Sequence, residues 1–257
     1  MARSDLWTRE QTILAFNLYY KIPYGTIHGR NSKLLELAKL IDRKPGGLGR
    51  KMQNLASFDP VQQARGIKGL THASKLDEEI FNEFVNDWEA LALESERILA
   101  EKQHISFEEK VEIDEQKWQS KSGRDVVRSV KVRAGQNFFR EIVLNNFDSK
   151  CAICGISIPA MLRASHIVPW SKDEKARVNP ENGLCLSALY DVAFDQGFIG
   201  LDTDYKIVLA NKLKKQKKES YYQEYFGKIE GAEIRQPSKF FPRKEFLEYH
   251  LDKIFDK

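Results

Sequence analysis

Apolar residues in the first 95 positions recur every three or four residues, which is the spacing of amphipathic helices. Thr8 and Gln11 form a capping box, which predicts that a helix starts there. Asn31 opens a second predicted helix, and further helices are predicted over residues 48–55 and 81–99. The pattern therefore predicts a helical domain over residues 1–95.

The predicted helix over residues 48–55 carries Arg50 and Lys51, which we expect to be exposed. A short helix, a turn and a basic helix resemble a helix-turn-helix or Myb-like unit. Three-helix units also serve as protein-interaction or purely structural modules, so both readings stay open. The charge-rich residues 96–123 are predicted to be a linker to a second domain over residues 124–257.

The second domain starts with a different pattern. VRSVKVR predicts a basic strand, Ala134-Gly135 predicts a turn, and residues 136–145 predict a helix. Further along, GFIGLDTDYKIVLANKL alternates as a β-hairpin does, with its turn at Asp202-Thr203-Asp204.

Between these segments the predicted order is strand, loop, strand, helix. The elements are expected over residues 164–168, 184–186 and 188–196. Pro169 ends the first strand, and Asn182-Gly183 is a turn that returns the chain into the second. Ser187 is placed to cap the helix, and Gly197 is placed to close it.

This stretch carries the candidate chemistry. Asp191 and Asp195 are one helical turn apart and project from one face, so their repulsion invites a hard divalent cation such as Mg²⁺. His166 on the preceding strand could take a proton from water near a metal-bound phosphate. Each residue also has an ordinary explanation: a structural histidine, solvated or helix-capping carboxylates, and for Asn182 simple turn geometry.

Taken in order, these residues resemble a known family. The segments are His166-Ile-Val-Pro-Trp170, Asn179-Pro-x-Asn182-Gly-Leu184 and Phe194-Asp-x-Gly197, preceded by Val132-Arg-x-Gly-Gln-x-Phe-Phe-Arg140 and Cys151-x-x-Cys154-Gly155. They are similar to the HNH endonuclease motif, in the branch found in predicted bacterial restriction endonucleases. The resemblance covers about residues 126–210.

The resemblance implies a ββα-metal nuclease, and hence an α+β chain with a helical N-terminal domain followed by an HNH domain. His166 would be the general base, and Asn182 would orient the loop and lie near the metal. Asp191 stands where the family usually has a metal-binding histidine, and Ser165 stands where it often has an aspartate ligand. Asp195 would bind the metal or brace the helix end. Carboxylate ligands favour Mg²⁺ or Mn²⁺, and the family's products are a 5′-phosphate and a 3′-hydroxyl.

Some HNH domains also hold a structural zinc on two Cys-x-x-Cys pairs. This chain has one pair, Cys151 and Cys154, together with Cys185 and no obvious fourth ligand. Because structural sites want four ligands, zinc is not expected, and the cysteines are interpreted as packing a turn. Three cysteines fit a reducing compartment.

Basic residues near the motif are the candidate DNA-binding residues. They are Arg128, Lys131, Arg133, Arg140 and Arg163. Positive groups close to a cutting site suit a phosphate backbone. The lysine run at 212–218 is equally consistent with DNA contact and with a solvated loop.

The composition narrows the function class. The 257 residues carry a net charge of +4 and contain no run of 18 apolar residues, so no membrane span is expected. The first residues lack a signal-peptide core, which favours the cytoplasm. By the resemblance to the HNH family, the leading hypothesis is metal-dependent DNA hydrolysis in bacterial restriction or phage defence. The alternatives are a DNA-binding protein with a decayed HNH domain and a non-nuclease interaction module. A double-strand cut would suit a homodimer.

Overall fold

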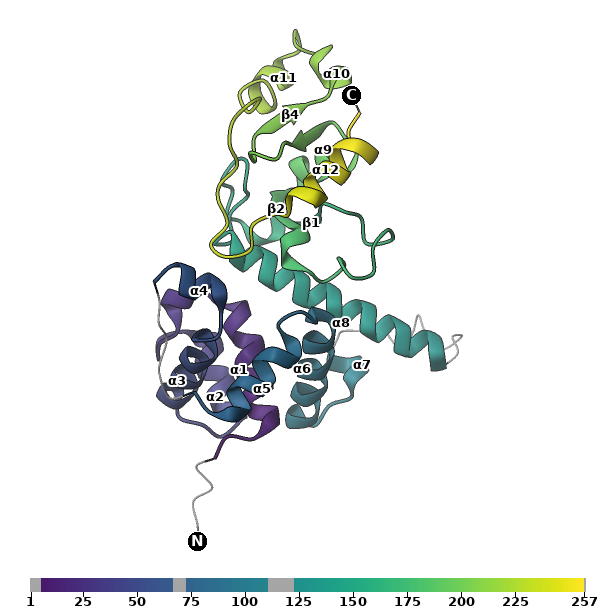
Figure 1. Cartoon of the computed structure of the whole chain (residues 1–257). Helices are drawn as coiled ribbons and strands as arrows, with labels where there is room; N and C mark the ends of the chain where they lie inside the picture. Colours follow the sequence, from purple (N-terminus) through teal and green to yellow (C-terminus); the bar gives the residue numbers. More distant parts are fainter. Residues whose placement is uncertain (1–5, 67–72, 111–122, 257) are drawn as a thin grey trace. The chain divides into compact units, whose positions relative to one another are not determined.

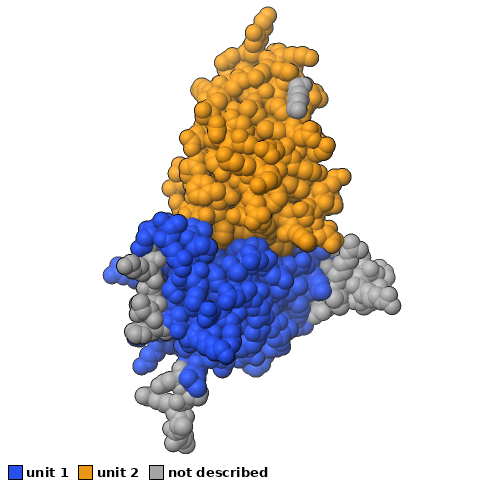
Figure 2. Space-filling model, viewed as in Figure 1, with its two compact units in different colours: residues 1–138 blue, residues 139–257 orange. Residues whose placement is uncertain are grey.

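The computed structural model describes residues 6–66, 73–110 and 123–256, with the backbone alone described for residues 108 and 123–128. Contacts divide the chain into two compact units, residues 1–138 and 139–257 (Figure 2). This division falls inside a helix, Gly123–Asn146. The predicted linker at residues 96–123 lies partly outside the described residues, so the predicted domain boundaries stay a prediction.

The described part of the first unit is built from helices (Figure 1). They are α1 (Arg9–Lys21), the 3₁₀ helix η1 (Tyr24–Thr26), α2 (Ser32–Leu40), α3 (Pro45–Ala56), α4 (Pro60–Ala64), α5 (Lys75–Phe84), α6 (Trp88–Gln103), α7 (Phe107–Lys110) and the first part of α8 (Gly123–Asn146). Helix α1 is central, because it is buried from Thr12 to Tyr20 and contacts α3, α5 and α6. The predicted capping box is confirmed, since both of its bonds between Thr8 and Gln11 are present.

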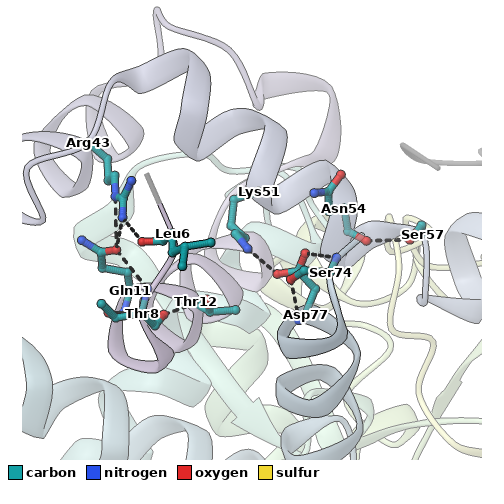
Figure 3. Close-up of polar contacts among 10 residues, drawn as sticks. All are labelled: Leu6, Thr8, Gln11, Thr12, Arg43, Lys51, Asn54, Ser57, Ser74 and Asp77. Atoms are coloured by element: carbon teal, nitrogen blue, oxygen red, sulfur yellow. Dashed lines mark hydrogen bonds and ion pairs between the residues drawn. The ribbon is translucent and has the colours of Figure 1, made fainter. Parts of the chain in front are cut away.

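Three predictions for the first unit need correction. The single helix predicted over 81–99 is two helices. Helix α5 ends at Phe84, and Asp87 caps the start of α6 by accepting a 2.9 Å hydrogen bond from Ala90 N. Helix α3 begins at Pro45, earlier than predicted, because proline at the first helical position loses no hydrogen bond. Lys51 is 5% exposed rather than solvated. Its ammonium pairs with the buried Asp77 at 2.5 Å (Figure 3).

The strand predicted over VRSVKVR and the turn at Ala134-Gly135 are also wrong, because α8 runs through both without a break. Val130, Ala134 and Phe138 lie on one face at intervals of four residues and are buried. Leu93 of α6 and Phe107 of α7 pack against Val130 and Ala134. Tertiary packing on this helical face overrides the strand preference of the valines in this segment.

The second unit combines short strands with helices, which confirms the α+β fold class. Its elements are η3 (Pro159–Met161), β1 (Leu162–His166), η4 (Pro180–Asn182), β2 (Gly183–Ser187), α9 (Ala188–Asp195), β3 (Ile199–Leu201), β4 (Ile207–Leu209), α10 (Asn211–Lys214), α11 (Ser220–Tyr225) and α12 (Lys244–Lys253). Strands β1 and β2 pair antiparallel, with His166 opposite Gly183. Helix α9 packs on both strands, so the predicted strand–loop–strand–helix order is confirmed.

Strands β3 and β4 form the predicted hairpin. Gly197 closes α9 with a φ of +72°, in the left-handed region that favours glycine. A Cβ atom there would meet the Ile254 carbonyl oxygen at 2.2 Å. Among the described helices, none is both long and apolar enough to cross a membrane.

Candidate active site

His166 is the last residue of β1 and is half-buried. Its ring stacks on Phe139 of α8, with centroids 3.9 Å apart and an angle of 10° between the planes. Trp170 meets the ring edge-on at 5.6 Å. Two aromatic side chains therefore fix the orientation of the imidazole.

The hydrogen bonding of His166 sets its tautomer. Nε2 lies 2.9 Å from the Arg177 carbonyl oxygen, which can only accept, so Nε2 carries the proton. Within the described residues Nδ1 has no protein partner, and it keeps its lone pair. Burial lowers the pKa of His166, opposed by the Arg177 carbonyl and the charge of Asp191. The ring is therefore neutral at neutral pH and has one basic nitrogen available.

Asn182 holds the loop that presents the Arg177 carbonyl. The amide is fully buried, and its Oδ1 accepts from Val168 N at 2.8 Å. Its Nδ2 donates to the carbonyl oxygens of Val168 at 3.0 Å and Ala176 at 3.1 Å. These bonds occupy the amide within the loop, so the contacts support the predicted loop-orienting role and give no support to a role as metal ligand.

The side chain of Arg177 ties down the same loop. Its Nε donates to the Trp170 carbonyl at 2.8 Å, and its guanidinium lies 5.5 Å from the centre of the Trp170 ring. An ion pair with Glu174 at 3.1 Å completes its contacts. Sequence reasoning missed Arg177, because the group that meets His166 is a backbone carbonyl and leaves no signature in the residue type.

Asp191 and Asp195 lie one turn apart on α9, the first half-buried and the second exposed. Although Asp195 is exposed overall, partial burial of its carboxyl and the charge of Asp191 raise its pKa to about 6. The charge of Asp191 also acts on His166. These three predicted residues therefore share one electrostatic environment.

The oxygen and nitrogen ligands near His166 can be compared with those that a divalent cation requires. Within the described ranges, no group of three or more histidine, cysteine, aspartate or glutamate side chains is placed to hold a metal. Mg²⁺, however, keeps several waters and commonly takes one or two protein carboxylates. A pair of carboxylates, Asp191 and Asp195, fits that requirement. Burial and then the charge of Asp191 raise the pKa of Asp195, and a bound cation would relieve the repulsion between the two.

Ser165 stands where the resemblance expects an aspartate in many family members. Its side chain is 3% exposed, and its hydroxyl has no partner among the described residues. Successive side chains of a strand point to opposite faces, so Ser165 faces away from the side on which His166 lies.

The predicted DNA-binding residues fall into two groups. Arg140 and Arg163 donate to carbonyl oxygens of the turn before β1. Lys131 and Arg133 are exposed on the part of α8 that belongs to the first unit. The side chain of Arg128 lies outside the described residues. DNA contact by these residues stays a prediction.

The cysteines are free thiols, with Cys151 and Cys185 buried and Cys154 exposed. Cys151 Sγ accepts a hydrogen bond from Ser187 N at 3.2 Å, which ties the Cys-x-x-Cys turn to the end of β2. Burial raises the pKa of Cys185 to about 12.

Residues 151–202, which include β1, β2 and α9, match the family model described as HNH endonuclease. The chain contains an HNH endonuclease domain. The matched residues include His166, Asn182, Asp191 and Asp195. The resemblance to the HNH family seen in the sequence is confirmed.

One solved structure, entitled "Modification dependent TagI restriction endonuclease", is similar to part of the chain. The identity is 20%, the TM-score is 0.31, and the similarity covers 45% of this chain and 37% of that one. The similarity thus spans well under half of that chain. Among curated proteins, none matches the present chain.

Gly183, opposite His166, allows a prediction. A Cβ atom there would lie 2.4 Å from Val143 Cγ2 and 2.9 Å from Phe139 Cζ, the ring that supports His166. We expect Gly183→Ala to lower the free energy of unfolding by about 1–3 kcal/mol through overpacking. Urea unfolding measures this. Gly46→Ala is the control, since a Cβ at Gly46 meets nothing within 4 Å. Equal stability of both variants would contradict the prediction.

His250 of α12 gives a pH prediction. It is 1% exposed, its ring stacks on Phe194 of α9 at 3.7 Å, and its Nε2 donates to the Phe194 carbonyl at 3.0 Å. Burial lowers its pKa to about 4, whereas an unfolded histidine titrates near ~6.5. The unfolded state therefore binds more protons between these values. The stabilisation from the neutral ring is complete above ~6.5 and is lost as pH falls towards 4, by up to roughly 3 kcal/mol.

Urea unfolding of the parent and of His250→Gln at several pH values between about 4.5 and 7 tests this prediction. Glutamine retains a donor for the Phe194 carbonyl but does not titrate. The parent should lose more stability on acidification than the variant does. Parallel pH profiles would show that His250 does not contribute.

Proposed function

We propose that the HNH domain hydrolyses DNA phosphodiester bonds with the help of a divalent cation, Mg²⁺ or Mn²⁺. The arrangement of His166 carries this proposal. Its ring is neutral, is oriented by two aromatic side chains, has its proton fixed on Nε2 and has a basic Nδ1. A histidine with only a structural role would not need this combination beside two carboxylates.

In the proposed reaction, Nδ1 of His166 takes the proton from the attacking water. The resulting imidazolium is stabilised by the Nε2–H bond to the Arg177 carbonyl and by the charge of Asp191. Asn182 keeps that carbonyl in place through its bonds to the loop. Asp191 and Asp195 would hold the cation, which when bound stabilises negative charge on the phosphate and the leaving oxygen.

The wider setting of this activity is part of the proposal. DNA as substrate rests on the HNH domain and on the basic residues around it. A role in bacterial restriction or phage defence, the cytoplasm as location and a homodimer for double-strand cuts rest on the sequence resemblance and composition alone.

Supercoiled plasmid DNA incubated with the purified chain tests the function. We expect nicked or linear product with Mg²⁺ or Mn²⁺ and none with a chelator. Asp191→Asn should raise the metal concentration that half-maximal cleavage requires, because it removes a charged ligand. Asp204→Asn, at an exposed carboxylate in the β3–β4 turn, is the matched control and should cleave as the parent does.

A DNA-binding protein with an inactive HNH domain is the second candidate. The observation that favours it is the two-carboxylate donor set, with Ser165 turned away where the family often has a third ligand. In that case the chain would retard DNA in a gel, and no metal would produce nicking. Neither retardation nor nicking would instead favour a protein-interaction module.

A further inference from the structure

The turn that leads into β1 presents an apolar tip to solvent. Ile158 is 56% exposed and Met161 is 44% exposed, and Pro159 and Ala160 between them are exposed as well. Exposed apolar side chains are common singly, but four in succession on one turn need a reason.

Two arginine side chains hydrogen-bond to backbone carbonyls of the tip and of the first residue of β1. Arg140 donates to the carbonyl oxygens of Leu162 at 3.0 Å and Pro159 at 3.3 Å. Arg163 donates to those of Ala160 and Leu162, both at 3.0 Å. Two successive turn residues, Pro159 and Ala160, and the first residue of β1 are thereby ordered without any partner, which lowers the entropy cost of inserting the tip into another molecule.

The sequence on either side of the tip is free of acidic residues and carries basic ones. No acidic residue occurs in the sequence between Asp148 and Asp173, whereas Lys150, Arg163 and Lys172 fall in this interval. A guanidinium has five N–H donors, so Arg140 and Arg163 retain donors beyond those that bond the turn. An apolar tip on a cationic base is suited to a polyanion that has an apolar interior.

We propose that Ile158 and Met161 form a wedge that inserts between base pairs of duplex DNA, while Arg140 and Arg163 bond the flanking phosphates. This inference rests on the proposed nuclease function and names how its substrate is held. Proteins that kink DNA insert isoleucine, methionine, leucine, phenylalanine or proline between base steps and recover the unstacking cost through added contacts. The tip offers three of these side chains in four residues.

The position of the wedge relative to the chemistry is set by β1. Leu162 and His166 are four residues apart on the strand, which corresponds to roughly 13 Å at ~3.3 Å per residue. Base pairs rise by ~3.4 Å, so unstacking is expected about four base pairs from the cleaved phosphate.

Fluorescence of 2-aminopurine tests the wedge, because this base brightens when it is unstacked. Duplexes carry it singly at successive positions around a mapped cut, or along an arbitrary sequence if no cut is found. Binding of the His166→Ala protein should raise the fluorescence at one or two adjacent positions. The double variant Ile158→Ser/Met161→Ser, in the same background, should abolish the rise and weaken binding by about tenfold. Both side chains are exposed, so the fold should persist, as circular dichroism can verify.

Phe241→Ser is the matched control, because Phe241 is 44% exposed elsewhere in the same unit. It should leave both fluorescence and affinity unchanged. A rise that survives in the double variant, or bound DNA without a rise at any position, would overturn the wedge and leave nuclease activity standing. A protein that unstacks DNA but never cleaves it would retain the wedge and defeat the proposed function. Failure to bind DNA would defeat both.

Discussion

Replacing His166 with alanine is expected to slow DNA cleavage by roughly 10²- to 10⁴-fold, the usual contribution of a positioned general base. Among the described residues, Nδ1 of His166 has no protein partner, and its Nε2 is hydrogen-bonded to the Arg177 carbonyl at 2.9 Å. Removing the ring leaves the carboxylates of α9 in place, so binding of metal and DNA should be little changed. Single-turnover cleavage of plasmid DNA and gel retardation measure the two effects separately.

The control for this variant is His28→Ala, which removes an exposed histidine of the first unit. It should cleave at the parent rate. Added imidazole should restore part of the activity of His166→Ala, because alanine leaves space beside Phe139 that the free base can enter. A role limited to packing would not respond to imidazole in this way. Parental activity in the alanine variant would remove His166 from the mechanism.

The strands and the helix that surround the site could be predicted because residues close to their ends determine where they begin and end. Pro169, Asn182-Gly183 and Gly197 limit which conformations the backbone can take, and each acts within a few residues. The strand ends and the end of α9 followed from them to within two residues. The motif then placed His166 and the two aspartates on neighbouring elements.

The contacts that orient His166 and set its protonation could not be predicted in the same way. His166 depends on the carbonyl of Arg177, on the ring of Phe139 in α8 and on Trp170. A carbonyl is common to every residue type, and the approach of α8 to β1 is a tertiary contact. Because VRSVKVR is rich in valine, which favours strands, the packing of Val130 and Ala134 is what identifies this segment as helix.

Lys51 shows the same limit in the first unit. A lysine on a predicted basic helix was expected to be solvated, and nothing local identifies a partner 26 residues away in α5. In the structure its ammonium lies 2.5 Å from Asp77, which is itself fully buried, and 4.9 Å from the centre of the Trp7 ring. The pair also removes one positive charge from the surface by which a helix-turn-helix-like unit would meet DNA.

Lys51→Met is therefore expected to destabilise the first unit by roughly 3–5 kcal/mol, since it leaves the Asp77 carboxylate buried without its counter-charge. Asp77 would retain its 2.8 Å bond from Ser74 N, which stabilises the start of α5 but does not neutralise the charge (Figure 3). Hydrogen exchange resolved along the chain should show faster exchange in α3 and α5. Exchange in β1, β2 and α9 should change much less, because they belong to the other compact unit.

Arg50→Met is the matched control, because Arg50 is the exposed neighbour on the same helix and its loss should alter stability by less than about 0.5 kcal/mol. Adding Asp77→Asn to Lys51→Met removes the unpaired charge and should restore part of the protection of α3 and α5. The double variant separates two causes: recovery identifies the buried charge as the source of the loss, whereas equal or greater loss identifies the packing of the lysine stem. Unchanged exchange in Lys51→Met would show that the ion pair does not stabilise the first unit.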